Sequence, residues 1–236
     1  MKHKNALPFA LCFAASLILI VGLLFTALQL CMNERAWYEK KYESYGLARQ
    51  IGISNADITS ALWRLIDYME GREESIQLTV VEHGVPVEMY NRQEIDHMVD
   101  VRALYQAWRG VRDFGLPAAA VLFAFGLFLA ERGKRGGLAC RAFVWASAAF
   151  GAVLAGLGAW VAVDFSGFWV AFHHLFFTND LWLMDYATCR MIRICPQQLF
   201  NDIVVRFGLM FLIPYGALLC AALFGKARLK RKGANA

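Results

Sequence analysis

The sequence predicts a membrane protein, an all-α bundle of four transmembrane helices with a small α+β extracytoplasmic cap. Of its 236 residues, 58% are hydrophobic, whereas soluble domains have about 45–50% apolar residues. The excess is concentrated in four long apolar runs, which is the pattern of membrane-spanning helices. The basic residues between these runs are unevenly distributed, so the chain also carries an orientation signal.

Four runs are expected to cross the membrane. A span needs about 20 apolar residues, and about 17 is the lower limit. The second and fourth runs are near that limit, so their ends are expected to include flanking polar residues. The first run follows a basic tip and exceeds the roughly 7–15 apolar residues of a signal peptide, so we interpret it as a retained helix. The runs are Leu7–Cys31, Phe114–Ala130, Ala142–Val163 and Phe207–Phe224.

The charges predict which segments face the cytoplasm. The N-terminal tip, residues 131–141 and the tail after Gly225 contain eleven Lys or Arg residues and one acidic residue. Residues 32–113 and 164–206 contain thirteen basic and eighteen acidic residues. Because basic loops stay in the cytoplasm, both termini are predicted to be cytoplasmic. The net charge of +5 therefore reflects topology and contact with anionic lipid, and it gives no indication of nucleic-acid binding.

These boundaries divide the chain into five predicted parts. They are the tip and first span (1–31), the extracytoplasmic cap (32–113), the second span, cytoplasmic loop and third span (114–163), an aromatic extracytoplasmic loop (164–206), and the fourth span with its basic tail (207–236).

Two helices are expected in the cap. Ser54 and Asp57 form the pattern of a capping box, and Gly71 can end the helix that they begin. Asn91, with Glu94 at the third position, predicts the start of another helix that continues towards the second span.

A β-hairpin is expected between these helices. Apolar residues alternate with polar ones from Ile76 to Val80, and His83-Gly84 is a turn signal before Val85–Tyr90.

His97 is the first candidate for chemistry. Asp100 lies three positions later, within side-chain reach on a helix, and Asp96 is its immediate neighbour. A carboxylate beside an imidazole fixes the tautomer and raises the basicity, as a general base requires. The alternative is a solvated acidic helix start without a catalytic role.

His173 is the second candidate. It lies in a stretch where aromatic residues recur at roughly helical spacing, which is typical of the membrane–water boundary. An ionisable side chain at that depth is costly to keep, so it is a functional candidate by default. The alternative is a ring that reaches towards water beside His174. Phe165–Phe177 is expected to line an acyl-chain cavity, and Gly151–Gly158 is expected to let helices approach closely.

The surroundings of both histidines resemble a known family. Phe172-His173-x-x-Phe176-Phe177, leading into Asn179-Asp180-Leu181-Trp182, is similar to a signature of the lipoprotein intramolecular transacylases, a four-span membrane family. Glu94-x-x-His97-Met98-x-Asp100-Val101 is similar to the second motif of that family. The order of spans, outer domain and motifs also agrees over nearly the whole chain.

This resemblance implies an acyl shift within one substrate. The sn-2 acyl chain of a diacylglyceryl-cysteine lipoprotein would pass to its own N-terminal α-amino group, giving an N-acyl lyso-form lipoprotein. Nucleophile and ester already belong to one molecule, so the enzyme has to supply mainly proton transfer and charge stabilisation. The implied partners are bacterial lipoproteins and membrane phospholipid, in the bacterial plasma membrane with the active site on the extracytoplasmic side. No cofactor or metal is implied.

The resemblance implies His97 and His173 as the catalytic pair. Our hypothesis is that His97 is the base and His173 the acid or oxyanion donor, although the sequence is equally compatible with the reverse. Asp100 or Asp96 is expected to orient His97. Further support is expected from Asn179, His174 and Trp182.

Several other classes of membrane protein share single features with this sequence. A membrane thiol/quinone oxidoreductase needs a reactive Cys pair in each outer loop or a Cys-x-x-Cys motif, but residues 32–113 contain no Cys. Cys189 and Cys195 are too far apart for that motif, although they could form a disulfide. A haem protein needs ligands on facing helices, and a zinc hydrolase needs a third ligand such as Asp100 or Asp185. A non-catalytic membrane accessory protein is the remaining alternative.

Overall fold

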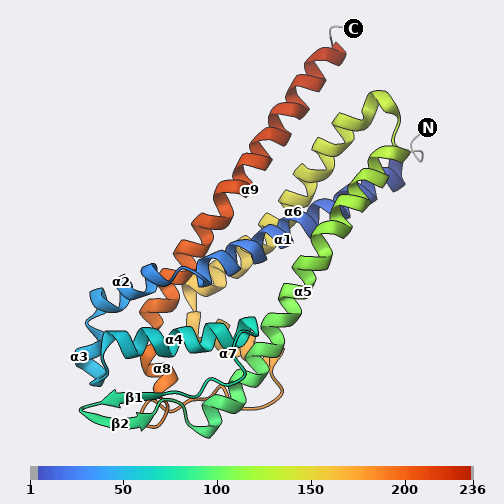
Figure 1. Ribbon diagram of the computed structural model, residues 1–236. Helices are drawn as coiled ribbons and strands as arrows, with labels where there is room; N and C mark the ends of the chain where they lie inside the picture. Colours follow the sequence, from blue (N-terminus) through green and yellow to red (C-terminus); the bar gives the residue numbers. More distant parts are fainter. Residues whose placement is uncertain (1–4, 235–236) are drawn as a thin grey trace. The chain divides into compact units, whose positions relative to one another are not determined.

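The computed structural model describes residues 5–234 of the chain, which are mostly helical (Figure 1). A two-stranded antiparallel sheet is the only sheet among these residues. The elements in order are α1 (Ala6–Met32), α2 (Arg35–Tyr45), α3 (Leu47–Ile51), α4 (Asn55–Glu70), β1 (Thr79–Glu82), β2 (Val85–Glu88), α5 (Arg92–Leu129), the 3₁₀ helix η2 (Arg132–Lys134), α6 (Arg135–Val163), α7 (Phe165–Phe176), α8 (Arg190–Ile194) and α9 (Gln197–Ala234).

Four of the described helices, α1, α5, α6 and α9, are long and apolar enough to cross a membrane. This confirms the predicted fold class. α5 and α9 extend well before their apolar runs, and they continue through Pro117 and Pro214. The membrane-crossing part of α5 is its apolar C-terminal half, because about 20 residues suffice for a span.

The chain forms two compact units, which we describe separately. The membrane unit comprises Met1–Ala27, Arg109–Phe168 and Gly208–Ala236. The hairpin unit comprises Leu28–Trp108 and Trp169–Phe207.

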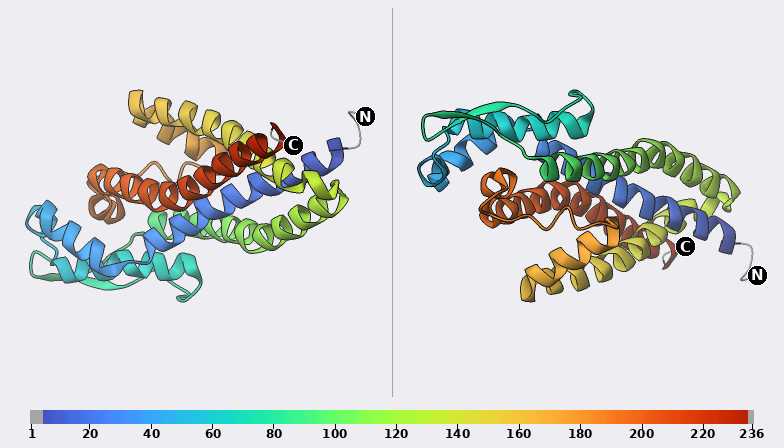
Figure 2. Two further views of the ribbon diagram at one scale, coloured as in Figure 1. Left: turned by 90° about the horizontal axis from the view of Figure 1, so that it is seen from above. Right: turned by 90° about the horizontal axis from the view of Figure 1, so that it is seen from below.

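In the membrane unit, α1 and α5 lie side by side (Figures 1 and 2). A Cβ atom added at Gly22 would lie 2.4 Å from the Leu116 side chain, and one at Gly126 would lie 2.8 Å from the Cys12 sulfur. These glycines therefore permit the close approach of the two helices. The close approach expected at Gly151–Gly158 is wrong, because nothing lies within 4 Å of a Cβ at Gly151, Gly156 or Gly158. Small residues permit close packing but do not require it.

Large apolar side chains also point outward from the membrane unit. Val121, Phe128 and Ile213 are 68–72% exposed. Such exposure is unfavourable in water and appropriate in contact with lipid chains.

The hairpin unit has a conventional buried core. Tyr38, Tyr42 and Tyr90 are almost completely buried. The Tyr42 hydroxyl donates to the Ile194 carbonyl at 2.9 Å, and the Tyr90 hydroxyl donates to the Ala61 carbonyl at 2.8 Å. Each large ring thus buries apolar surface without leaving its hydroxyl unpaired.

The predicted hairpin is present, with Glu82 paired to Val85 across the turn. His83 and Gly84 have φ values of 50° and 82°, and two-residue hairpin turns of type I′ need positive φ at both positions. β2 ends at Glu88 rather than continuing to Tyr90.

Both predicted helix starts in this unit are confirmed. The Ser54 side chain accepts a hydrogen bond from the Asp57 amide at 3.0 Å. The Asn91 side chain accepts one from the Glu94 amide at 3.0 Å, and the Glu94 carboxylate accepts one from the Asn91 amide at 2.7 Å. This reciprocal pair is a complete capping box. Gly71 ends α4 in the left-handed conformation, as expected.

Candidate active site

His173 lies near the end of α7, in a pocket of aromatic rings. It is 5% exposed. Its ring centroid lies 4.5 Å from that of Trp169, 4.7 Å from Trp182 and 5.6 Å from Phe177. Trp169 and His173 lie four residues apart on one face of α7, whereas Phe177 and Trp182 come from the chain that follows the helix.

The tautomer of His173 follows from its one hydrogen bond. Nδ1 lies 2.7 Å from the Trp169 carbonyl oxygen. A carbonyl oxygen only accepts hydrogen bonds, so Nδ1 carries the proton. The neutral ring then presents an unprotonated Nε2, which is able to accept a proton.

His97 lies in the first turns of α5 and faces His173. It is 7% exposed, and the two ring centroids are 6.3 Å apart at an interplanar angle of 28°. Phe177 contacts both, at 5.4 Å from His97 and 5.6 Å from His173. The His97 Nδ1 atom is buried without a hydrogen-bond partner in the described chain. The structure therefore brings the two candidate histidines together in an apolar site with free hydrogen-bonding capacity.

Asp100 and Asn179 lie beside this pair. The Asn179 side-chain amide donates to the Asp100 carboxylate at 2.8 Å, and its oxygen accepts from the Leu181 amide at 3.1 Å. The negative charge of Asp100 acts on His97, because it raises the pKa of that imidazole. Asp100 belongs to the sequence motif of His97 and is bonded to Asn179, which belongs to the sequence motif of His173.

Of the three remaining candidate residues, Trp182 contacts one ring of the histidine pair, whereas the side chains of Asp96 and His174 contact other residues. Asp96 forms a salt bridge with Arg92 at 2.9 Å on the exposed side of α5, so it is not placed to orient His97. Trp182 stacks on His173 and belongs to the site. His174 is exposed, and its ring lies edge-on to Trp182 with the centroids 5.3 Å apart.

Sequence reasoning missed Gln93. Its side-chain amide donates to the carbonyls of both Leu181 and Leu183, each at 3.0 Å. These bonds hold the backbone on either side of Trp182, the residue that stacks on His173. The available signal was its place four residues before His97, on the same face of the helix.

The loop that carries Trp182 is anchored to the rest of the hairpin unit by charged groups. The Glu94 carboxylate accepts a hydrogen bond from the Met191 amide at 2.5 Å. Glu82 forms salt bridges with Arg190 at 2.6 Å and with Arg193 at 2.9 Å. The capping residue of α5 thus also fixes the start of α8.

Burial keeps both imidazoles neutral. They lie in the hairpin unit, outside the membrane-crossing parts of the helices. Burial, followed by the nearby His173, lowers the pKa of His97 to about 4, against an opposing effect of Asp100. Burial also lowers the pKa of His173, although its bond to Trp169 opposes this and the neighbouring His174 adds to it. Both rings are therefore uncharged at pH 7, as bases and neutral hydrogen-bond donors must be.

The lowered pKa of His97 predicts that acid destabilises the folded protein. Between pH 6.5 and about 4, an unfolded His97 binds a proton while the folded one does not, so acid favours the unfolded state. The neutral, buried His97 contributes about 3 kcal/mol to the free energy of unfolding. This contribution is complete above pH 6.5 and is lost between pH 6.5 and 4. Thermal unfolding in detergent at pH 7 and pH 4.5 tests this. His97→Gln cannot titrate, so its melting temperature should fall less than that of the wild type. Equal falls in melting temperature for the wild type and His97→Gln would refute the lowered pKa of His97.

Cys189 and Cys195 are free thiols in this structure, so no disulfide joins them. Burial raises the pKa of the Cys195 thiol to about 12. Such a thiol stays protonated and is a poor nucleophile, which does not favour the thiol/quinone oxidoreductase class. Within residues 5–234, no three His, Cys, Asp or Glu side chains are grouped so that they could hold a metal ion.

The fold is similar to that of three solved structures. The chain is similar to the membrane-integral lipoprotein intramolecular transacylase Lit from Bacillus cereus, with a TM-score of 0.72, 17% identity and complete coverage of both chains. A variant of that enzyme with one histidine replaced by arginine gives a TM-score of 0.68 at 17% identity, over 99% of this chain and 95% of the other. The corresponding alanine variant gives 0.67 at 17% identity, over 100% and 97%.

Comparison at the level of sequence identifies the family. The search of curated proteins found no match. The sequence model of the family described as "Lipoprotein intramolecular transacylase Lit" matches residues 13–200, which is most of the chain. The chain therefore belongs to the lipoprotein intramolecular transacylases, a family of membrane-integral enzymes.

Proposed function

We propose that this enzyme moves the sn-2 acyl chain of a diacylglyceryl-cysteine lipoprotein to the α-amino group of the same cysteine. The observation that carries the proposal is the pair of buried, neutral imidazoles of His97 and His173, 6.3 Å apart. At this separation one reacting group can approach both rings. The product is an N-acyl lyso-form lipoprotein.

His173 is assigned as the base, which reverses the role expected from the sequence. Its Nδ1 proton is held by the Trp169 carbonyl, so Nε2 is free to accept a proton. The α-amino nitrogen attacks the ester carbonyl carbon, the new N–C bond forms, and the amine proton passes to Nε2. The C–O bond to the glyceryl oxygen then breaks, and the same proton passes to that oxygen. No external donor or acceptor is needed.

His97 is assigned to the oxyanion. A ring with a pKa of about 4 is neutral at pH 7. A neutral imidazole N–H can polarise a carbonyl without transferring its proton. The unpartnered Nδ1 of His97 is consistent with a site that acquires its hydrogen bond only when substrate is bound. Such a preorganised donor is most effective in an apolar site from which water is excluded.

Asp100 and Asn179 are assigned positioning roles. Their mutual hydrogen bond of 2.8 Å connects the helix of His97 with the loop of Trp182. Asp100 also places a negative charge near His97, which favours a fixed ring orientation.

The proposed location is the bacterial plasma membrane, with both termini in the cytoplasm and the active site outside. The support is the charge distribution of the sequence, with basic residues concentrated in the N-terminal tip, residues 131–141 and the tail. A lipoprotein substrate is lipid-modified outside the cytoplasm, so this orientation gives the site access to it.

Mass spectrometry of a lipoprotein N-terminus tests the function. The chain is expressed in a bacterial host that lacks its own N-acylating enzymes. We expect a monoacylglyceryl cysteine with an N-linked acyl chain. An unchanged diacylglyceryl cysteine with a free amine, from well-expressed wild-type protein, would overturn the proposal.

The position of the transferred chain needs a second measurement. Lipoprotein carrying different acyl chains at sn-1 and sn-2 distinguishes the two sources. Recovery of the sn-2 chain on nitrogen supports the proposed reaction, and recovery of the sn-1 chain contradicts it.

A further inference from the structure

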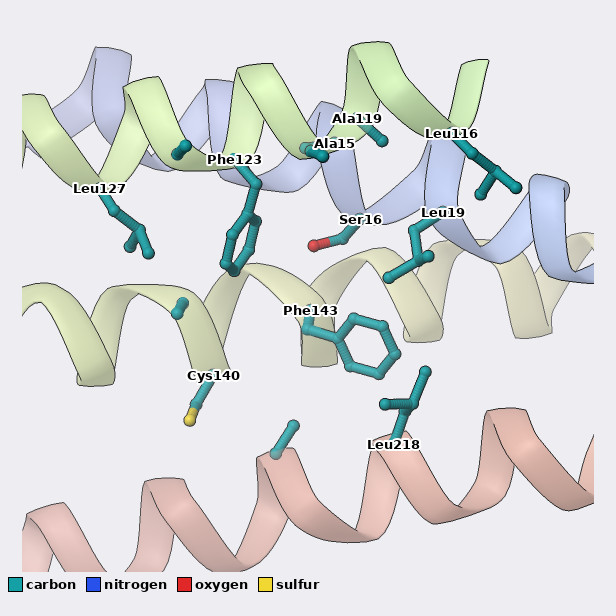
Figure 3. Close-up of a pocket in the computed structure, with 14 residues that line it drawn as sticks. Ala15, Ser16, Leu19, Leu116, Ala119, Phe123, Leu127, Cys140, Phe143 and Leu218 are labelled. Carbon is teal, nitrogen blue, oxygen red and sulfur yellow. The ribbon is translucent and has the colours of Figure 1, made fainter. Parts of the chain in front are cut away.

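The membrane unit contains a cavity of about 600 Å³ between α1, α5, α6 and α9. Figure 3 shows Leu19, Phe123 and Leu218 pointing into the space between the helices. The cavity exists because alanines such as Ala15, Ala120 and Ala139 occupy much of its wall. A volume of this size is within the roughly 300–1,000 Å³ of typical ligand sites.

The wall of the cavity is apolar. Ser16 and Cys140 are its only residues with polar side-chain atoms, among fourteen that line it. The Ser16 hydroxyl donates a hydrogen bond to the Cys12 carbonyl at 2.7 Å within α1. Water needs two to four polar partners, and this wall does not offer them. The chemistry of the cavity therefore fits hydrocarbon.

The cavity is open to the outside of the membrane unit. Ala120 and Ala124 on α5 are exposed, and Leu218 on α9 is 41% exposed. All three lie in membrane-crossing parts of their helices, where the surrounding medium is lipid chains. The hydrocarbon available at this opening is thus an acyl chain of a bilayer lipid.

Two cations follow, in the sequence, a residue that lines the cavity and a residue packed against it. Cys140, which lines the cavity, is closely packed against Gly225, since a Cβ at Gly225 would lie 2.9 Å from its sulfur. Arg141 and Lys226 follow these two residues directly. Arg141 lies over the Phe9 ring at 4.9 Å, and in the described part of the chain neither cation has a carboxylate partner. Their charge is complementary to a lipid phosphate.

We propose that this cavity binds one acyl chain of an anionic phospholipid, whose phosphate is held by Arg141 and Lys226. All lining residues belong to the membrane unit, whereas His97 and His173 belong to the hairpin unit. The proposed lipid site is therefore built from residues of the membrane unit alone. The proposal does not rest on the proposed reaction.

Native mass spectrometry of the purified protein in detergent tests it. The protein is titrated with phosphatidylglycerol, and with phosphatidylcholine that has the same acyl chains. We expect one phosphatidylglycerol to bind at least tenfold more tightly than further copies. Ala120→Phe and Ala139→Phe, which fill the cavity from two helices, should each weaken this binding at least tenfold.

Ala118→Phe is the matched control, because Ala118 is exposed on the same helix and does not line the cavity. It should bind lipid as the wild type does. Arg141→Gln combined with Lys226→Gln should remove the preference for phosphatidylglycerol. Wild-type binding by both cavity-filling variants would overturn the site, and wild-type preference in the double Gln variant would overturn the headgroup assignment. Neither readout depends on N-acylation.

Discussion

Replacing His173 by Gln should lower the rate of N-acylation by about 10²–10⁴-fold, because a base in proton transfer typically contributes that much. Gln keeps a side-chain group able to donate to the Trp169 carbonyl, but it cannot accept a proton at the position of Nε2. His97→Gln should cause a comparable loss, through weaker stabilisation of the oxyanion. The rates are measured by mass spectrometry of the lipoprotein substrate with purified enzyme.

His174→Gln and His83→Gln are the matched controls, since His174 is exposed and His83 lies in the hairpin turn. Both should retain activity within a few-fold of the wild type. Full activity of either His97→Gln or His173→Gln would rule out the assigned role of that residue. Loss in all four variants would instead indicate a general effect on folding.

Replacing Glu94 by Ala should destabilise the hairpin unit by about 2–6 kcal/mol, because two amides would lose their acceptor at about 1–3 kcal/mol each. The Glu94 side chain is completely buried and accepts hydrogen bonds from the amides of Asn91 and Met191. Thermal unfolding in detergent should show a lower melting temperature. N-acylation should fall as well, since the loop that carries Trp182 would lose an anchor.

Asp96→Ala is the control for Glu94, two residues away on the same helix. Its carboxylate forms only an exposed pair with Arg92, and such pairs contribute about 0–1 kcal/mol. Its melting temperature should stay near that of the wild type. Equal stability of the two variants would show that the buried capping box does not hold the unit together.

The features that sequence reasoning predicted well are those with local causes. The capping box of Asn91 and Glu94 depends on residues three apart, and the turn at His83-Gly84 depends on two adjacent backbone conformations. The four spans follow from apolar length alone. The extent of α5 was less predictable, because its polar first half has no hydropathy signal that joins it to the span.

The sequence indicated which residues to propose for the site, but it did not indicate their geometry. The motifs indicated His97 and His173, but their ring separation of 6.3 Å depends on contacts between distant parts of the chain. The role of Trp169 is carried by its carbonyl oxygen, which any residue would supply, so sequence contains no signal for it. The proposed mechanism therefore assigns the base to His173, whereas the hypothesis from sequence named His97 and left the reverse open.

The hydrogen bond between His173 Nδ1 and the Trp169 carbonyl also constrains the path of the proton. A histidine with both nitrogens free can take a proton on one and release another from the opposite edge of its ring. His173 has only Nε2 available, so proton uptake and delivery must occur at the same atom. In the proposed reaction, the attacking nitrogen and the departing oxygen are bonded to one carbon and lie close to each other. A single nitrogen can therefore serve both in turn, while the tetrahedral intermediate remains in place.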